Sequence, residues 1–191
     1  MGVVKHRLFW PIAALLTLVV INTVARPQFI KVTVRDGQLY GALIDILRNS
    51  APLMLVALGM TIVIATRGID LSVGAVMAVS GAVALTIIHD SGSPDNLGTV
   101  VSAVVAALLV ALVLGSWNGI LIAVLGIQPI IATLVLMLAG RGVALLITEG
   151  FITTVNSGPF EYIATGYLLV LPFAFLISLT PSILIGLCER R

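Results

Sequence analysis

The 191-residue sequence contains few of the residues that enzymes and metal sites commonly use. It has one cysteine, Cys188, and two histidines, His6 and His89, which lie far apart in the chain. A single cysteine excludes an internal disulfide, and this composition supplies no clustered metal ligands. His89, Asp90 and Ser91 adjoin one another, but a catalytic triad is defined by geometry in space and not by adjacency. We therefore expect no enzyme activity, no metal and no cofactor.

Charged residues are also scarce. Asp, Glu, Lys and Arg make up 9% of the chain, against about 25% in a typical soluble domain. Hydrophobic residues make up 60%, and the mean hydropathy is +1.21. A soluble protein of this length could not bury so much apolar surface in one core. The net charge of +2 comes from scattered basic residues, so nucleic acid is not an expected partner. The composition indicates a protein surrounded largely by lipid.

The two lysines exclude ATP binding through a P-loop. That motif reads GxxxxGK[ST], whereas Lys5 and Lys31 follow Val4 and Ile30 and not glycine. A GxSxG nucleophile elbow is also absent from the sequence. If the protein works with ATP, another subunit must hydrolyse it.

Long apolar runs dominate what remains. A helix that crosses a bilayer needs about 20 mostly apolar residues, with a lower limit of about 17. Six segments are candidates: Leu8–Ala25, Ser50–Thr66, Leu71–Ile88, Leu97–Leu125, Pro129–Thr148 and Gly166–Cys188. The last contains Pro172 and Pro181, so we expect it to be kinked or broken. The predicted fold is all-α, a polytopic transmembrane bundle of about six helices that forms one domain over residues 1–191.

The connections between these segments carry the polar residues. Residues 89–96, HDSGSPDN, predict a turn-rich loop, and Glu149–Thr165 predicts a longer polar loop. The short link Gly126–Gln128 predicts that the helices on either side are antiparallel neighbours. Within Arg26–Asn49, apolar residues from Leu39 to Leu47 recur at helical spacing. This spacing predicts a short amphipathic helix at the membrane surface.

The basic residues give only a weak indication of orientation. With the N-terminus inside, they divide almost evenly between the two sides of the membrane. Lys5 and Arg7 flank the first helix, which usually dominates orientation, and they favour a cytoplasmic N-terminus. The first apolar run is longer than the 7–15 residues typical of a signal peptide, so we interpret it as a membrane helix.

Small residues recur at every fourth position in two predicted helices. One stripe consists of Gly74, Ala78 and Ala82, and the other of Ala103, Ala107, Ala111, Gly115 and Gly119. Lipid is as apolar as leucine, so membrane helices associate through close packing, which small residues permit. We interpret both stripes as helix–helix interfaces. The alternative is chance recurrence in an alanine-rich sequence.

The segment TRGIDLSVGA, residues 66–75, places polar residues between two apolar runs. Gly68 permits backbone angles that other residues avoid. Asp70 is predicted to cap the following helix by accepting hydrogen bonds from amides near Ser72 and Val73. Arg67 is positioned in sequence to pair with Asp70. A functional interpretation is compatible with this capping, since irregular backbone at membrane depth persists only beside protein or water.

Arg141, between Gly140 and Gly142, is a second ionisable residue within a predicted span. Such residues are costly in a membrane and often functional. The structural alternative is that its guanidinium extends to the interface or binds backbone carbonyls of a neighbouring helix.

Two stretches carry a family resemblance. GIDLSVGA, residues 68–75, resembles the signature of permease subunits of bacterial ABC importers for ribose, xylose and galactose. GSWNGILIAVLGIQPIIATLVLMLAGRGVALLIT, residues 115–148, resembles the fourth and fifth helices of that family. The resemblance extends from about Leu8 to Val170. It marks nine signature residues with expected roles in the pathway or in packing: Gly68, Asp70, Ser72, Gly74, Asn118, Gln128, Pro129, Thr133 and Arg141.

The resemblance implies a multi-pass protein of the bacterial inner membrane that forms the translocation path for a monosaccharide. It also implies three protein partners: a second permease subunit, a cytoplasmic ATP-binding subunit and a periplasmic sugar-binding protein. The alternative is a non-transporting helical membrane protein, or a remnant that acts only by associating with partners.

The sequence departs from the family pattern in two respects. Arg67 stands where the family has glycine, and members of the family are longer and contain more membrane helices. We therefore expect residues 1–191 to correspond to the N-terminal, truncated portion of such a permease. We also expect that this portion alone does not couple ATP hydrolysis to transport.

Overall fold

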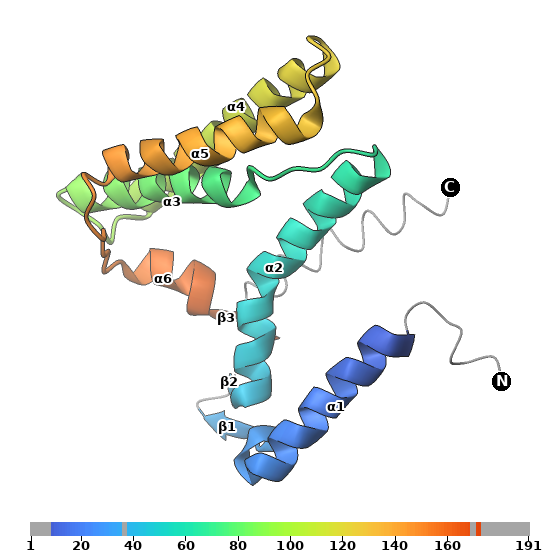
Figure 1. The fold of residues 1–191 in the computed structure, drawn as a ribbon. Helices are drawn as coiled ribbons and strands as arrows, with labels where there is room; N and C mark the ends of the chain where they lie inside the picture. The colour runs from blue at the N-terminus through green and yellow to red at the C-terminus, as the bar shows by residue number, and fades with distance from the viewer. Residues whose placement is uncertain (1–8, 36–37, 169–170, 173–191) are drawn as a thin grey trace.

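The computed structural model describes residues 9–35, 38–168 and 171–172. Within these residues the chain is mainly helical. The α-helices are α1 (Phe9–Ala25), α2 (Ala42–Ala65), α3 (Val73–Asp90), α4 (Leu97–Ala123), α5 (Pro129–Ile147) and α6 (Gly158–Thr165). The shorter elements are the 3-10 helix η2 (Pro27–Ile30) and the strands β1 (Thr33–Arg35), β2 (Gln38–Tyr40), β3 (Tyr167–Leu168) and β4 (Leu171–Pro172). The predicted all-α class is confirmed. Figure 1 shows α3, α4 and α5 in one packed group, with α1 and α2 apart from it.

Among the described residues, four helices are long and apolar enough to cross a membrane: α2, α3, α4 and α5. They correspond to the second to fifth predicted segments. The first segment forms α1, which has 17 residues and is therefore about 26 Å long at 1.5 Å per residue. That length is slightly less than the roughly 30 Å of a bilayer core.

The sixth predicted segment, Gly166–Cys188, lies mostly outside the described residues. Its described beginning is not helical, because β3 pairs antiparallel with β4. Pro172 lacks a backbone N–H and biases Leu171 toward extended backbone angles, which disfavours a helix at this point. The prediction of a helix is therefore wrong for residues 167–168 and 171–172.

The connection between α1 and α2 differs from the predicted amphipathic surface helix. Leu39 and Tyr40 lie in β2, which pairs antiparallel with β1 and matches Arg35 with Gln38. The dipeptide Asp36-Gly37 between the strands is a strong sequence signal for a two-residue hairpin connection. The apolar spacing of this segment also fits a helix, so the prediction of a helix is wrong for Leu39 and Tyr40.

The remainder of that predicted surface helix is continuous with the second membrane segment as α2. Asp45 and Arg48 form an ion pair of 3.3 Å between Oδ1 and NH2, while Ile44 and Ala51 are the buried residues of α2. Pro52 lies within the helix and removes one backbone hydrogen bond, a common cause of kinks. Figure 1 shows the two ends of α2 running in different directions. The prediction of a separate helix is therefore wrong, although its polar and apolar faces are present.

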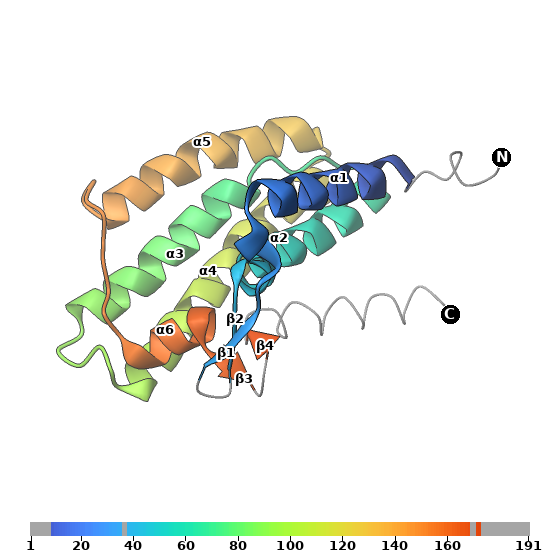
Figure 2. The same ribbon diagram turned by 90° about the horizontal axis from the view of Figure 1, so that it is seen from below.

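Helix α3 is the centre of the packed group. It contacts both α4 and α5 extensively, whereas α4 and α5 contact each other less, and Figure 2 shows α3 between them. Toward α5, Ala75 packs so closely that a Cβ added to Gly140 would lie 2.9 Å from the Ala75 Cβ. Toward α4, Ala84 and Ile88 form a core cluster with Ala103. Small residues thus permit α3 to approach both neighbours closely.

The two small-residue stripes serve this packing only in part. In α4, Ala103 is buried and Ala107 packs against the core cluster, but Gly115 and Gly119 are exposed. In α3, Ala82 is buried, whereas Gly74 and Ala78 are exposed. The buried face of α3 is set instead by Ala75, Val79, Ala82, Ala84 and Ile88. Four-residue spacing alone therefore misplaced part of each interface.

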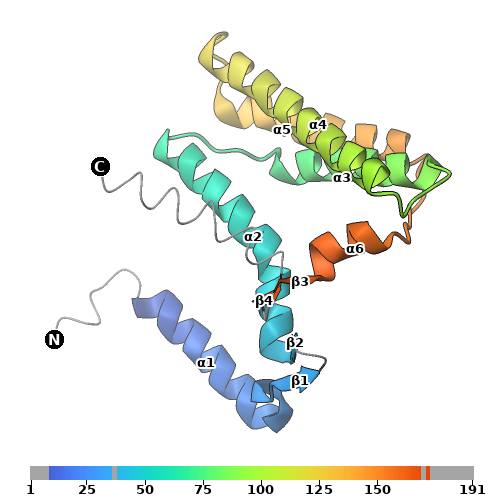
Figure 3. The same ribbon diagram turned by 180° about the vertical axis from the view of Figure 1, so that it is seen from behind.

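The segment Glu149–Thr165, predicted as a loop, contains α6. Ser157 caps this helix by accepting a hydrogen bond from the Phe160 amide at 3.4 Å, and its hydroxyl donates to the Pro94 carbonyl at 2.7 Å. The Gly158 amide donates to Asp95 Oδ1 at 2.9 Å. These bonds attach the start of α6 to the α3–α4 loop, which lies 63 residues earlier. Figure 3, in which the molecule is seen from behind, shows α6 beside the pair formed by α3 and α4.

Candidate functional site in the interruption between two membrane helices

The interruption between α2 and α3 begins with a hydrogen-bonded helix terminus. The Gly68 amide donates to Val63 O at 3.0 Å, and the Arg67 amide donates to Ile64 O at 2.9 Å. These two bonds define a Schellman motif, in which the residue at the Arg67 position has a left-handed backbone and is usually glycine. Arg67 has φ of 60°. Arg67, where the resemblance leads us to expect glycine, therefore occupies a position where glycine is physically preferred.

Asp70 organises the other end of the interruption. Its Oδ1 accepts two hydrogen bonds from Ser72, one from the amide at 2.7 Å and one from the hydroxyl at 2.6 Å. The predicted bond from the Ser72 amide is present, but the predicted capping role of Asp70 is wrong: Ser72 is the N-cap residue of α3, and the helix has no side-chain capping bond. The expected ion pair with Arg67 is wrong, because the one ion pair among the described residues joins Arg48 and Asp45. Arg67 is exposed at the end of α2.

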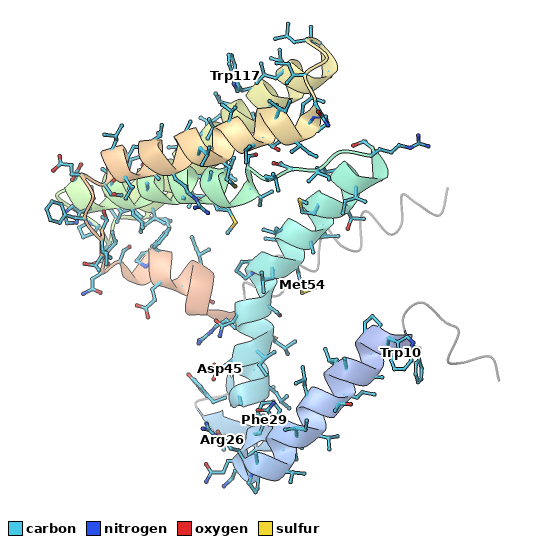
Figure 4. The ribbon with its side chains drawn as sticks, viewed as in Figure 1. Trp10, Arg26, Phe29, Asp45, Met54 and Trp117 are labelled. Carbon is cyan, nitrogen blue, oxygen red and sulfur yellow. The ribbon has the colours of Figure 1, made fainter. Side chains whose placement is uncertain are left out.

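Helix α4 is connected to this interruption by Asn118. The Asn118 Nδ2 donates to Ser72 Oγ at 3.0 Å, over a separation of 46 residues in sequence. Both side chains are buried, with exposed fractions of 6% for Asn118 and 2% for Ser72. The neighbouring Trp117 is 57% exposed and projects away from α3 (Figure 4). The rotation of α4 therefore directs its amide toward the interruption and its large aromatic ring outward.

Helix α5 borders the interruption at its N-terminus. Thr133 is buried, and its hydroxyl donates to Pro129 O at 2.8 Å and lies 3.4 Å from Ile69 O. Gln128 is the N-cap residue but makes no side-chain capping bond, and its backbone carbonyl accepts from the Ile131 and Ala132 amides. Pro129 follows at the first helical position, where its missing N–H has no cost.

A cleft with a volume of about 400 Å³ lies beside the interruption. This volume is within the range of about 300–1,000 Å³ that is typical of small-molecule sites. Its wall comes from the end of α2, the interruption and two further helices: Val63, Thr66, Gly68, Ile69, Asp70, Gly115, Asn118, Gly119, Ile122, Ala123, Pro129 and Thr133. The lining is mostly apolar with a few polar groups.

The structure brings six of the nine signature residues together and leaves three apart. Gly68, Asp70, Asn118, Pro129 and Thr133 line the cleft, and Ser72 is bonded to two of them. Three do not line it: Gly74 is exposed on α3, Gln128 is exposed before α5, and Arg141 is exposed farther along α5.

The lining also includes Gly115 and Gly119, which the sequence analysis assigned to helix packing. The pattern Gly115, Asn118, Gly119 and Ile122 follows the i, i+3, i+4, i+7 spacing of one helix face. This spacing could have predicted that Gly115 and Gly119 line the cleft, because it places both glycines on the same helix face as Asn118.

A second cavity of about 380 Å³ lies at the far end of α3 and is lined by residues that include His89, Asp90 and Glu149. The Ser91 hydroxyl donates to Ile88 O at 2.7 Å, so it is engaged with the end of its own helix. This cavity contains none of the nine signature residues. We therefore place the candidate site at the interruption.

Long apolar helices, an interrupted backbone between two of them and a cleft at that interruption are together the features of a membrane permease. Comparison with known proteins agrees. The chain belongs to the family described as branched-chain amino acid transport system / permease component, whose model matches residues 42–188. It is therefore a multi-pass membrane protein.

Several curated relatives are permeases for sugars. The galactofuranose transporter permease protein of Escherichia coli K12 is 45% identical over 98% of this chain and 54% of its own length. The fructose import permease protein of Bifidobacterium longum is 40% identical over 98% of this chain and 52% of its own. The ribose import permease protein of Escherichia coli K12 is 39% identical over 76% of this chain and 40% of its own. The chain thus spans about half the length of the curated relatives it matches. No solved structure matches it.

Proposed function

We propose that this chain is a transmembrane permease subunit of an ATP-driven sugar importer in the bacterial inner membrane, and that the cleft at Asp70 belongs to its translocation path. The observation that carries the proposal is the similarity of nearly the whole chain to permeases for galactofuranose and fructose. The solute is a monosaccharide, and the subunit moves it without chemical change.

The chemistry of the cleft supports a neutral, hydroxyl-bearing solute. Its wall is mostly apolar and includes four polar residues: Thr66, Asp70, Asn118 and Thr133. Irregular backbone within a membrane requires protein or water beside it. Transporter sites commonly occur where membrane helices are interrupted, because the freed backbone and helix ends can meet the solute. The cleft lies at such an interruption, between α2 and α3.

The proposed partners are those that the resemblance to ABC importer permeases implies. A separate cytoplasmic ATP-binding subunit supplies the energy; within residues 1–191, neither lysine follows glycine as a P-loop requires. A periplasmic sugar-binding protein delivers the solute, and a second permease subunit completes the path. The N-terminus lies in the cytoplasm in this arrangement, as Lys5 and Arg7 favour.

Genetic removal and restoration test the proposal. Cells that lack the gene are expected to lose uptake of one member of a labelled panel of ribose, xylose, fructose and galactose, and a plasmid that encodes the permease at the full length of its relatives, residues 1–191 included, restores it. The restored protein is also expected to co-purify with an ATP-binding subunit. Unchanged uptake of all four sugars after removal would contradict the proposal and favour a non-transporting membrane protein.

A further inference from the structure

One polar atom in the cleft wall has no partner. Asn118 Oδ1 is buried, and no donor in the described part of the chain lies within hydrogen-bonding distance of it. An unpaired buried acceptor is destabilising, and native proteins contain few. Asn118 itself is 94% buried, since its exposed fraction is 6%, and it lines the cleft.

The orientation of the Asn118 amide follows from its neighbours. Asp70 Oδ1 accepts from the Ser72 amide, so it is an acceptor, and the Ser72 hydroxyl must donate its single proton to it. The Ser72 oxygen can then only accept from Asn118, which requires the NH2 side of the amide to face Ser72. The carbonyl oxygen is therefore presented as an acceptor away from Ser72.

The surface around Asn118 leaves space for a solute. Gly115 lies three residues before it and Gly119 one residue after it, and both line the cleft. A Cβ added to either glycine would meet nothing within 4 Å. Among the described residues, close helix packing therefore does not require these glycines, and they leave the cleft wall near Asn118 without side chains at two positions.

We propose that Asn118 Oδ1 accepts a hydrogen bond from one hydroxyl of the transported solute, and that Asp70 fixes the amide for this contact through Ser72. This inference rests on the proposed function and adds a specificity-determining residue to it. Pairing with the hydroxyl satisfies an acceptor that has no partner among the described residues, so the contact favours solutes that carry that hydroxyl. A buried polar group that loses its partner discriminates strongly against analogues without it.

Uptake of deoxy sugars tests the contact. For the sugar identified by the removal experiment, kcat/KM for uptake is measured for the parent and for each monodeoxy analogue. In wild-type cells, one analogue is expected to have a kcat/KM about tenfold below the parent, as for the loss of one hydrogen bond. In cells with Asn118→Leu, the ratio of parent to analogue kcat/KM is expected to be about tenfold smaller than the same ratio in wild-type cells. The binding protein is the same in both strains, so its own discrimination cancels from the comparison.

Two further variants make the test decisive. Asn22→Leu makes the same chemical change on α1, where the amide bonds to Leu18 O, and the tenfold discrimination is expected to persist. Gly115→Ala keeps Asn118 but adds a methyl group to the cleft wall three residues before it, on the same helix face, so discrimination is expected to fall below about threefold. It provides the readout if Asn118→Leu does not accumulate in the membrane. Equal discrimination in wild type and in the cleft variants, with uptake intact, overturns this inference alone. Unchanged uptake after gene removal overturns the proposed function as well.

Discussion

Replacement of Arg67 by glycine is expected to stabilise the protein. Arg67 has φ of 60°, and a left-handed backbone costs a residue with a side chain about 1–2 kcal/mol. Glycine removes that cost but makes the unfolded chain more flexible, which offsets about 0.4–1 kcal/mol. The net expectation is a gain of about 1 kcal/mol in the free energy of unfolding. Since Arg67 has no ion-pair partner among the described residues, the substitution breaks no such contact there.

The assay is thermal unfolding of the purified protein in detergent, supported by equilibrium denaturation. For a protein of this size, a gain of about 1 kcal/mol raises the Tm by about 2–4 °C. Arg141→Gly is the matched control, because it makes the same substitution within helix α5. Glycine in a helix interior costs up to about 1 kcal/mol relative to other residues, so this variant is expected to unfold at a lower temperature.

A higher Tm for Arg67→Gly together with a lower Tm for Arg141→Gly would establish that the backbone conformation at each position determines the change in stability. A second test of the same motif is available at Glu149, which follows α5 with φ of 54° and has the same pair of terminal hydrogen bonds. Glu149→Gly is also expected to raise the Tm. Lower stability for both Arg67→Gly and Glu149→Gly would refute the reasoning, because the left-handed backbone would then carry no measurable cost.

Two other predictions concern helix packing and topology. Gly140→Ala is expected to lower the free energy of unfolding by about 1–3 kcal/mol, because the added Cβ would meet Ala75. Gly142→Ala has open space around its Cβ and is expected to raise the free energy of unfolding by up to about 1 kcal/mol. Unfolding measurements that give the reverse order would contradict the packing of α3 on α5. In a Cys188→Ser background, single cysteines at residues 66 and 125 are expected to react with an impermeant thiol reagent from one side of the membrane, and those at residues 93 and 151 from the other. Labelling of all four from one side would exclude the crossings of α3, α4 and α5.

The membrane helices were predictable where apolar runs coincide with terminal signals. Helix α4 begins at the predicted residue, and the Asn96 side chain caps it by accepting from the Gly98 amide at 2.8 Å. Helix α5 begins at the predicted Pro129. In both cases the residue that starts the helix lies at the helix end itself, as Asn96 and Pro129 do, so the start could be predicted from the local sequence.

The elements that were wrongly predicted depend on competing or distant interactions. Leu39 and Tyr40 fit a helical pattern, but the Asp36-Gly37 dipeptide and pairing with β1 favour a strand. Helix α6 depends on Ser157, which bonds to a carbonyl 63 residues away as well as to its own helix. Periodicity could not predict that long-range contact.

The candidate site was predictable as a set of residues but not as an arrangement. The sequence pattern identified Asp70, Ser72 and Asn118 separately. The bond between Ser72 and Asn118 depends on how α4 is rotated against α3, which four-residue spacing did not determine. Gly115 and Gly119 illustrate the same difficulty, since the spacing that suggested an interface instead places them in the cleft wall.

The hydrogen bonds around the interruption have a mechanical consequence. Ser72, on the side of α3, is bonded to α4, and Ile69 lies 3.4 Å from the hydroxyl of Thr133 in α5. Within the described part of the chain, Thr66, on the side of α2, bonds only to residues of its own helix. Residues 67–71 are thus bonded to the packed group of α3, α4 and α5 at one end and to α2 alone at the other. A hinge rotation at residues 67–71 would move α2 relative to α3, α4 and α5. Because Val63 and Thr66 of α2 line the cleft, this rotation would change the width of the cleft.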